Sequence, residues 1–133
     1  DKWLTNIPPE APVSRIARRA IGSRLRAVAH YLAQAGQTKK PAKDDVHQLR
    51  IWTRRAAAAL RLFDPLVPAK RGGPLKKTLK KLRRAAGRVR DCDVFLDQLE
   101  ASGNQSPRMI EALRSQRRQA RRALRARCGR LLD

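Results

Sequence analysis

The chain has 133 residues, of which 32 are Lys or Arg and only 11 are Asp or Glu, so its formal net charge is +21 at neutral pH. This length favours a single domain, and 41% hydrophobic residues, mostly Ala and Leu, are enough for a helical core. So much like charge opposes compaction and favours a polyanionic partner: nucleic acid, an anionic membrane or a phosphate polymer.

Several kinds of protein do not fit this sequence. It has no apolar run long enough to cross a bilayer and no signal-like apolar segment near its start. Because the first residue is Asp1 and the only methionine is Met109, we expect a fragment of a longer reading frame or a processed product. Cys92 and Cys128 are too few for a disulfide framework and lack metal-ligand spacing, so we expect free thiols in a reducing, cytoplasmic compartment.

Residues 1–13 are rich in proline and have no helical periodicity, so we interpret them as a linker or docking arm. A first helix is predicted from a Ser14 cap to about Ala35, with Gly36 as its stop. Its expected buried face consists of Ala17, Ala20, Ile21, Leu25, Val28 and Leu32. Its other face carries Arg15, Arg19, Arg26 and His30.

A second helix is predicted over residues 44–63, after a loop at 37–43, with Asp44 or Asp45 as its cap and Asp64-Pro65 as its end. Its apolar face consists of Leu49, Trp52, Ala56, Leu60 and Phe63. At about 100° per residue, a basic stripe lies opposite, formed by His47, Arg50, Arg54 and Arg61. No carboxylate follows Asp45 within the helix, so this stripe lacks the usual i,i+4 partners, and the arginine fork suits phosphate oxygens.

A third helix is predicted over residues 74–101, with residues 65–73 as a loop and Pro74 in its first turn. Its apolar stripe contains Leu75, Leu79, Leu82, Ala86 and Val89, and continues through Cys92, Leu96 and Leu99. The opposite face carries a basic row of Lys77, Lys81, Arg84 and Arg88, with Lys80 beside it. Gly87, between the two faces, indicates close helix packing, a mild kink, or access of a ligand to the basic row.

Asp91 is expected to hold Lys80, Arg84 and Arg88 in place by charge-assisted hydrogen bonds. Asp91 and Asp93 could instead form a metal pair, but the surrounding cations oppose a further cation. We therefore predict no metal site and no cofactor.

A fourth helix is predicted over residues 107–132, with Ser106 as its cap and Pro107 at its first position. Its expected inward face consists of Met109, Leu113, Ala120, Leu124 and Leu131. Its basic row consists of Arg114, Arg118, Arg121 and Arg125. Short connections make neighbouring helices antiparallel, so residues 14–133 are predicted to form an all-α, antiparallel four-helix bundle.

Two segments of this sequence resemble one known family. VHQLRIWTRRAAAALRLF (46–63) and LKKLRRAAGRVRDCDVFLDQL (79–99) are similar to the CHAD domain, the conserved histidine α-helical domain. The family pattern is matched on the second helix by His47, Arg50, Arg54, Arg55 and Leu60-Arg61-Leu62-Phe63. On the third helix it is matched by Gly87, Arg90, Asp91, Asp93 and Val94. Ala86 departs from the Leu that family members usually have before the glycine, which suggests tighter packing there.

The resemblance implies an all-helical domain that binds inorganic polyphosphate and associates with polyphosphate granules. Full CHAD domains resemble two helical repeats with a basic channel between them, so this chain corresponds to one repeat, the N-terminal one. The partner would then be a missing second repeat or a second copy of the chain. The predicted polyphosphate-binding residues are His47, Arg50, Arg54, Arg55, Arg61, Lys77, Lys80, Lys81, Arg84, Arg88, Arg90, Arg114, Arg118, Arg121, Arg125 and Arg19.

The favoured hypothesis is a non-catalytic polyphosphate-binding module, in which His47 is a neutral hydrogen-bond donor to phosphate. A non-specific nucleic-acid binder is the alternative, but only 4% of residues are aromatic, and Trp52, Phe63 and Phe95 fall on faces expected to be buried. A phosphate-transferring enzyme lacks support, because the sequence has no P-loop and no carboxylate cluster. The loop lysines Lys39 and Lys40 are expected to matter much less for binding than Arg54 or Arg84.

Overall fold

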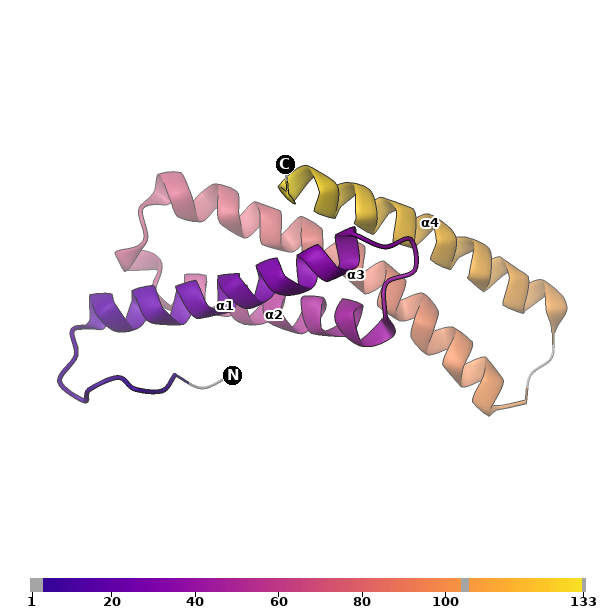
Figure 1. The fold of residues 1–133 in the computed structure, drawn as a ribbon, viewed down its shortest axis with the longest axis horizontal. Helices are drawn as coiled ribbons and strands as arrows, with labels where there is room; N and C mark the ends of the chain where they lie inside the picture. The colour runs from indigo at the N-terminus through magenta and orange to yellow at the C-terminus, as the bar shows by residue number, and fades with distance from the viewer. Residues whose placement is uncertain (1–3, 104–105, 133) are drawn as a thin grey trace.

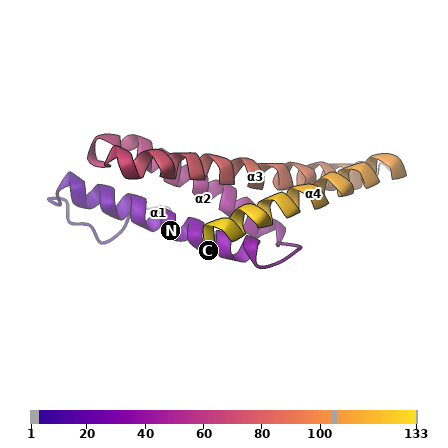
Figure 2. The same ribbon diagram turned by 90° about the horizontal axis from the view of Figure 1, so that it is seen from above.

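The computed structural model describes residues 4–103 and 106–132, which form four α-helices and no strand (Figure 1). The helices are α1 (Val13–Gly36), α2 (Lys43–Leu62), α3 (Ala69–Ala101) and α4 (Pro107–Leu132), and a short 3-10 helix, η1, spans Asp64–Leu66. Each α-helix packs on the next one along the chain, and α1 also packs on α4. Figure 2 shows the C-terminal end of α4 beside α1. The predicted all-α, antiparallel bundle is confirmed.

The core is built from the apolar stripes of all four helices. Its largest fully buried side chains include Leu49 and Leu60 of α2, Leu82 of α3 and Leu124 of α4. Trp52 is also buried, with 8% of its surface exposed, as its place on the apolar face of α2 predicts, whereas Phe63 is half-buried. Most core positions are Ala, Val or Leu, so the helices can approach closely and little aromatic surface is needed to fill the interior.

Two of the predicted helix caps are wrong. The residues before α1 and α2 are Pro12 and Ala42, and neither helix has a side-chain cap. Both residues have extended backbone, so the helix starts at the next residue without a Ser or Asp acceptor. Asp44 and Asp45 lie inside the first turn of α2, where their charge still favours the positive end of the helix dipole. The predicted Ser106 cap is confirmed, because its Oγ accepts the Met109 N–H at 3.5 Å.

The third helix starts five residues earlier than its proline predicts. α3 begins at Ala69 behind Pro68, so Pro74 lies in the helix interior, and the predicted loop at 65–73 is wrong over its second half. The reason is the packing of Gly72, which is buried against Val67. A Cβ at position 72 would lie 3.1 Å from Val67 Cγ1. Because glycine has no side chain, the segment that carries Val67 can pack closely on the first turn of α3.

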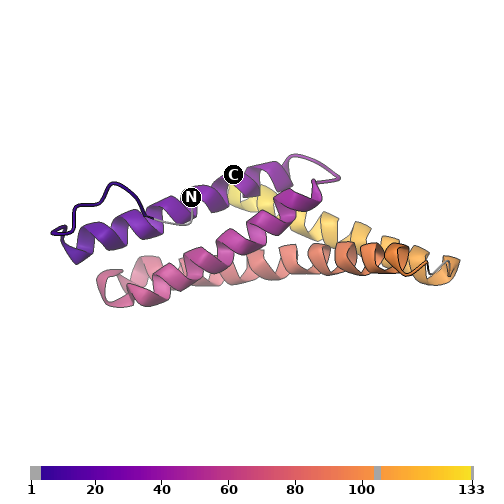
Figure 3. The same ribbon diagram turned by 90° about the horizontal axis from the view of Figure 1, so that it is seen from below.

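Three apolar side chains that were expected to face inward are exposed: Phe95 by 55%, Met109 by 47% and Leu131 by 40%. With 33 residues, α3 is about 50 Å long, whereas the 20 residues of α2 span only about 30 Å. The α3–α4 hairpin therefore extends past the other helices, as Figures 1 and 3 show. Phe95 and Met109 lie on this hairpin arm (residues 91–103 and 106–113), and Leu131 lies near the end of α4, where fewer neighbours cover it.

A leucine pair tests the core. We expect Leu82→Ala to lower the free energy of unfolding by about 2–5 kcal/mol, because Leu82 is 1% exposed and its removal leaves a cavity. Leu62→Ala, at a position 73% exposed, is the matched control and should change stability by less than about 0.5 kcal/mol. Urea unfolding followed by circular dichroism measures both. Equal losses for the two variants would contradict the assigned core.

Candidate functional site

Two rows of basic side chains face each other along α2 and α3. Lys43 Nζ of α2 lies 2.7 Å from Asp97 Oδ1 of α3, and a Cβ on Gly87 would lie 3.9 Å from Arg50 Nε. Further along, Arg61 shares a hollow with Lys76, Lys80 and Arg83. These contacts set one antiparallel alignment, and helical spacing places the intervening residues on the same faces. We call this set the α2–α3 basic strip: His47, Arg50, Arg54, Arg61, Lys76, Lys80, Arg83 and Arg90.

The α3 row that lies beside α2 differs by one residue from the expected one. The row of Lys77, Lys81, Arg84 and Arg88 was expected to face the second helix, but none of these four residues lines the hollow that holds Arg61. Arg88 lies beside α4, in a hollow that it shares with Phe95 and Ala120. A shift of one residue turns a helical position by about 100°, so the neighbouring row at 76, 80, 83 and 90 faces α2 instead.

Each end of the strip is closed by an ion pair, and its middle is not neutralised. Lys43 pairs with Asp97 at one end, and Lys76 hydrogen-bonds Asp64 at the other. Between these ends lie Arg50, Arg54, Arg61, Lys80, Arg83 and Arg90. None of the six has an ion pair among the described residues. Like charges so close together repel, which leaves the strip electrostatically suited to an anion.

His47 and Gly87 lie on the strip among these cations. His47 is half-buried, and its Nδ1 is buried without a hydrogen-bond partner in the described part of the chain. Such a nitrogen costs free energy unless water or a ligand bonds it. An added Cβ on Gly87 would make only ordinary contact with Arg50, so close packing does not require this glycine. Its missing side chain keeps the space beside the Arg50 guanidinium open.

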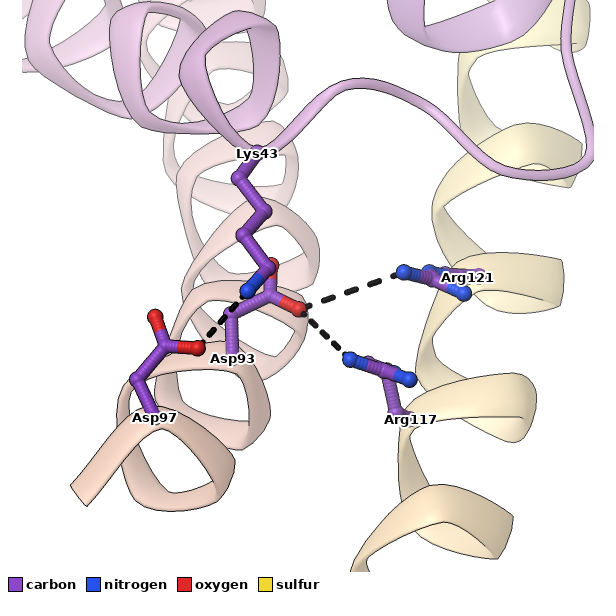
Figure 4. A network of polar contacts seen from close by, with 5 residues as sticks. All are labelled: Lys43, Asp93, Asp97, Arg117 and Arg121. Atoms are coloured by element: carbon purple, nitrogen blue, oxygen red, sulfur yellow. Dashed lines mark hydrogen bonds and ion pairs between the residues drawn. The ribbon is translucent and has the colours of Figure 1, made fainter. Parts of the chain in front are cut away.

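A buried carboxylate joins α3 to α4 (Figure 4). Asp93 is 1% exposed, and its Oδ1 accepts a long hydrogen bond of 3.4 Å from Arg117 Nη1. Arg121 Nη2 lies 4.0 Å from the same oxygen. The expectation that Asp91 holds the α3 cations is wrong. Asp91 lies about 200° around the helix from Asp93, is exposed, and makes no ion pair with any described residue.

The two arginines at Asp93 are only partly satisfied. The Nε atoms of Arg117 and Arg121 are both buried without a hydrogen-bond partner among the described residues. Burial, and then the neighbouring Arg117 charge, lower the pKa of Arg121. Burial and the nearby Asp93 carboxylate raise the pKa of the Cys92 thiol, and burial raises that of Cys128 to about 11. Both cysteines are free, as expected, and neither is a ready thiolate at neutral pH.

The remaining predicted residues lie in four other places. Arg19 is exposed on α1 and donates to the Thr5 carbonyl at 3.4 Å, and Arg55 lies 4.6 Å from the centre of the Trp52 ring, so neither joins the strip. Arg114 lines a hollow with Lys43 and Asp97. The other α4 arginines line a separate hollow of about 370 Å³, the α4 basic hollow, formed by Lys39, Lys40, Arg118, Arg121, Arg122 and Arg125.

Sequence reasoning missed Lys76 and Arg83 on the strip, and Lys39, Lys40 and Arg122 in the α4 basic hollow. The first two have a periodic signal, because Lys76, Lys80, Arg83, Gly87 and Arg90 recur with the same spacing as the row that was chosen. The loop lysines have no such signal, because their place depends on how the α1–α2 connection folds.

Among the described residues, no three His, Cys, Asp or Glu side chains gather in a way that could hold a metal ion. None of the described helices carries an apolar stretch that could cross a bilayer.

Comparison with known proteins gives one match. The family model described as the CHAD domain matches residues 19–130, which include the strip, the Asp93 network and the α4 basic hollow. No curated protein and no solved structure matches the chain.

The Asp93 network generates a stability prediction. Asp93→Asn should lower the free energy of unfolding by about 3 kcal/mol, because it leaves two largely buried guanidinium charges without their carboxylate. Asp64→Asn removes the carboxylate of an exposed pair and should cost less than about 1 kcal/mol. Urea unfolding at fixed ionic strength compares them, and a loss at Asp93 no larger than at Asp64 would count against a structural role for the network.

Proposed function

The chain belongs to the CHAD domain family, and from this premise we propose that it binds inorganic polyphosphate along the α2–α3 basic strip without catalysis. The observation that carries the proposal is a set of six cations, arranged in two facing rows, that make no ion pair among the described residues. Folding brings these charges together against their mutual repulsion. A bound polyanion relieves that repulsion and stabilises the folded chain by mass action.

The shape of the strip suits a linear, flexible anion. On each helix its members span 15 residues, from His47 to Arg61 and from Lys76 to Arg90, which is about 20 Å. Successive phosphates can meet side chains from alternating sides, and the arginine forks bind phosphate oxygens in pairs. Neutralising the polyanion releases its condensed counterions, so binding should weaken steeply with salt. His47 completes the site as a neutral donor to a phosphate oxygen.

Nucleic acid is the weaker candidate for this surface. Binding to single strands uses aromatic platforms on which bases stack. Trp52 is buried beneath Arg55, Phe63 is half-buried, and the exposed Phe95 lies on the hairpin arm rather than on the strip. The strip therefore offers phosphate contacts without base contacts, which supports a ligand that consists of phosphate alone.

The surroundings of His47 on the strip fit a role in binding rather than in catalysis. His47 has no carboxylate within ion-pair or hydrogen-bond distance among the described residues, so the base-and-orienting-carboxylate arrangement of many hydrolases is missing there. We accordingly assign the chain no reaction.

We further propose that it lies in the cytoplasm at polyphosphate granules. A fluorescent fusion that stays diffuse in cells with visible granules would contradict this location.

The surface of the hairpin arm favours a partner that is a second helical unit of the same kind, either another copy of the chain or a second repeat. Phe95 and Met109 are half exposed there and line an apolar hollow with Leu99 and Leu113. Residues 91–113 contain five carboxylates and one arginine, in a chain of net charge +21. A second basic unit would meet less repulsion at this arm than elsewhere on the chain.

A competition assay tests the function. Long-chain polyphosphate, heparin and single-stranded RNA are compared at matched charge concentration across a salt series, and released orthophosphate is measured in parallel. We expect polyphosphate to displace the other two and no orthophosphate to appear. Equal or tighter binding of RNA would support the nucleic-acid alternative, and steady release of phosphate would make the chain an enzyme.

Adjacent arginines on α3 test the site itself. Arg83→Ala should weaken polyphosphate binding by roughly tenfold and lower the slope of log K against log salt by about one, because Arg83 faces α2. Arg84→Ala removes the same charge from the exposed side of α3 and should have a clearly smaller effect. Arg54→Ala should resemble Arg83→Ala. If Arg84→Ala weakens binding as much as Arg83→Ala, net charge alone explains the affinity.

Sedimentation at high salt tests the partner. The isolated chain should self-associate at high concentration, and Phe95→Asp should abolish this by placing a charge in the apolar hollow. Leu62→Asp, at an exposed apolar position away from the arm, should leave association unchanged. A chain that stays monomeric at all concentrations would exclude the second copy and leave the second repeat as the partner.

A further inference from the structure

The α4 basic hollow is built from two segments far apart in the sequence. Lys39 and Lys40 come from the connection between α1 and α2, and four arginines come from two turns of α4. The arginines follow the spacing i, i+3, i+4 and i+7, which puts them on one face of the helix. Every side chain that lines the hollow is a cation: Lys39, Lys40, Arg118, Arg121, Arg122 and Arg125.

The loop that presents the two lysines is held at several points. The Gln37 N–H donates to the Ala33 carbonyl at 3.2 Å and ends α1, and the Lys40 N–H donates to Thr38 Oγ1 at 3.2 Å. Pro41 is buried, and α2 begins at Lys43. The lysines are thus carried by a short connection that is fixed on both sides, and they are exposed towards α4.

The positive charge of the hollow is poorly compensated. Arg118 has one exposed partner, Glu111, at 2.9 Å, and Arg121 reaches Asp93 only at 4.0 Å. Arg122, Arg125, Lys39 and Lys40 have no ion pair among the described residues. Arg121 is mostly buried, with 14% of its side chain exposed, and its Nε has no hydrogen-bond partner in the described part of the chain. Its position therefore cannot relax easily away from the neighbouring charges.

We propose that the α4 basic hollow is a second anion site, separate from the α2–α3 basic strip, which binds a compact group of adjacent phosphoryl units. The inference rests on the proposed function, since both sites bind phosphate. The two sites differ in shape. The strip is a pair of rows about 20 Å long, whereas the hollow gathers six cations around one concavity of about 370 Å³. A short polyphosphate or the end of a long chain supplies the matching ligand.

This proposal reverses one expectation from the sequence. Lys39 and Lys40 were expected to matter little, as solvated loop charges, but the structure places them opposite four arginines. Their removal should therefore weaken the binding of a compact phosphate more than the loss of two other charges from the surface.

The test uses tripolyphosphate as the probe, in calorimetric titrations of the whole chain at fixed salt. The wild-type chain should bind two equivalents. The Lys39→Ala/Lys40→Ala variant should lose about tenfold or more in affinity at one of them. The Arg50→Ala/Arg83→Ala variant should lose affinity at the other. Arg15→Ala/Arg18→Ala, which removes two exposed α1 charges outside both sites, is the matched control and should keep both equivalents.

The outcomes separate this inference from the proposed function. A single equivalent, abolished only by Arg50→Ala/Arg83→Ala, overturns the second site and leaves the strip in place. Equal small losses for the Lys39/Lys40 and Arg15/Arg18 variants also overturn it. No binding of any phosphate by a folded wild-type chain overturns the proposed function itself. Circular dichroism checks that each variant keeps its helix content.

A comparison of chain lengths identifies the source of the ligand. At equal total phosphate, long-chain polyphosphate presents far fewer chain ends than tripolyphosphate. If the hollow binds chain ends, the binding lost in the Lys39→Ala/Lys40→Ala variant depends on the number of chains present and not on total phosphate. If it binds free short polyphosphate only, long chains leave the hollow empty and the Lys39/Lys40 variant binds them as well as the wild type does.

Discussion

Repulsion among 32 basic side chains, set against only 11 carboxylates, is the constraint on which the rest of this structure depends. The carboxylates that form ion pairs are used mainly where elements meet. Asp97 joins α3 to the start of α2, Asp64 of η1 joins Lys76 of α3, and Asp93 joins α3 to α4. Among the described residues, only the Glu111–Arg118 pair lies within one helix. The acids therefore hold the helices together at the points where cations would otherwise drive them apart.

This use of the acids leaves most cations unpaired on the surface, and the folded chain concentrates them. The α2–α3 basic strip runs between two ion pairs, and the α4 basic hollow shares Arg121 with the Asp93 network. Each carries several charges in positions that the fold fixes. Stability and ligand binding are thus coupled, because an anion removes the repulsion that the folded state would otherwise retain.

α3 is the helix that organises the molecule. One of its faces supplies Leu79, Leu82 and Val89 to the core, a second supplies cations to the strip, and its C-terminal part supplies Asp93 to α4. Its length has a further consequence, because it extends beyond α2 and leaves Phe95 exposed. A helix of ordinary length could not serve the core, the strip and the hairpin arm together.

The sequence by itself determined that the chain is helical, how many helices it has, and which residues form most of the core. Leu49, Leu60, Leu82 and Leu124 each lie on the apolar stripe that helical periodicity predicts for their helix, and all four are buried. The motif around His47 and Arg50 also indicated the CHAD family before any contact was known.

Only the tertiary structure decided which basic row of α3 faces α2, because between Lys70 and Arg90 this helix carries cations over most of its polar surface and periodicity fits two rows equally well. It also decided that Asp93 rather than Asp91 is buried, and that Lys39 and Lys40 lie opposite α4. The physical reason is the same in each case. Periodicity within a helix determines which side is apolar, but the partner of a charged side chain is set by contacts between segments that are distant in sequence.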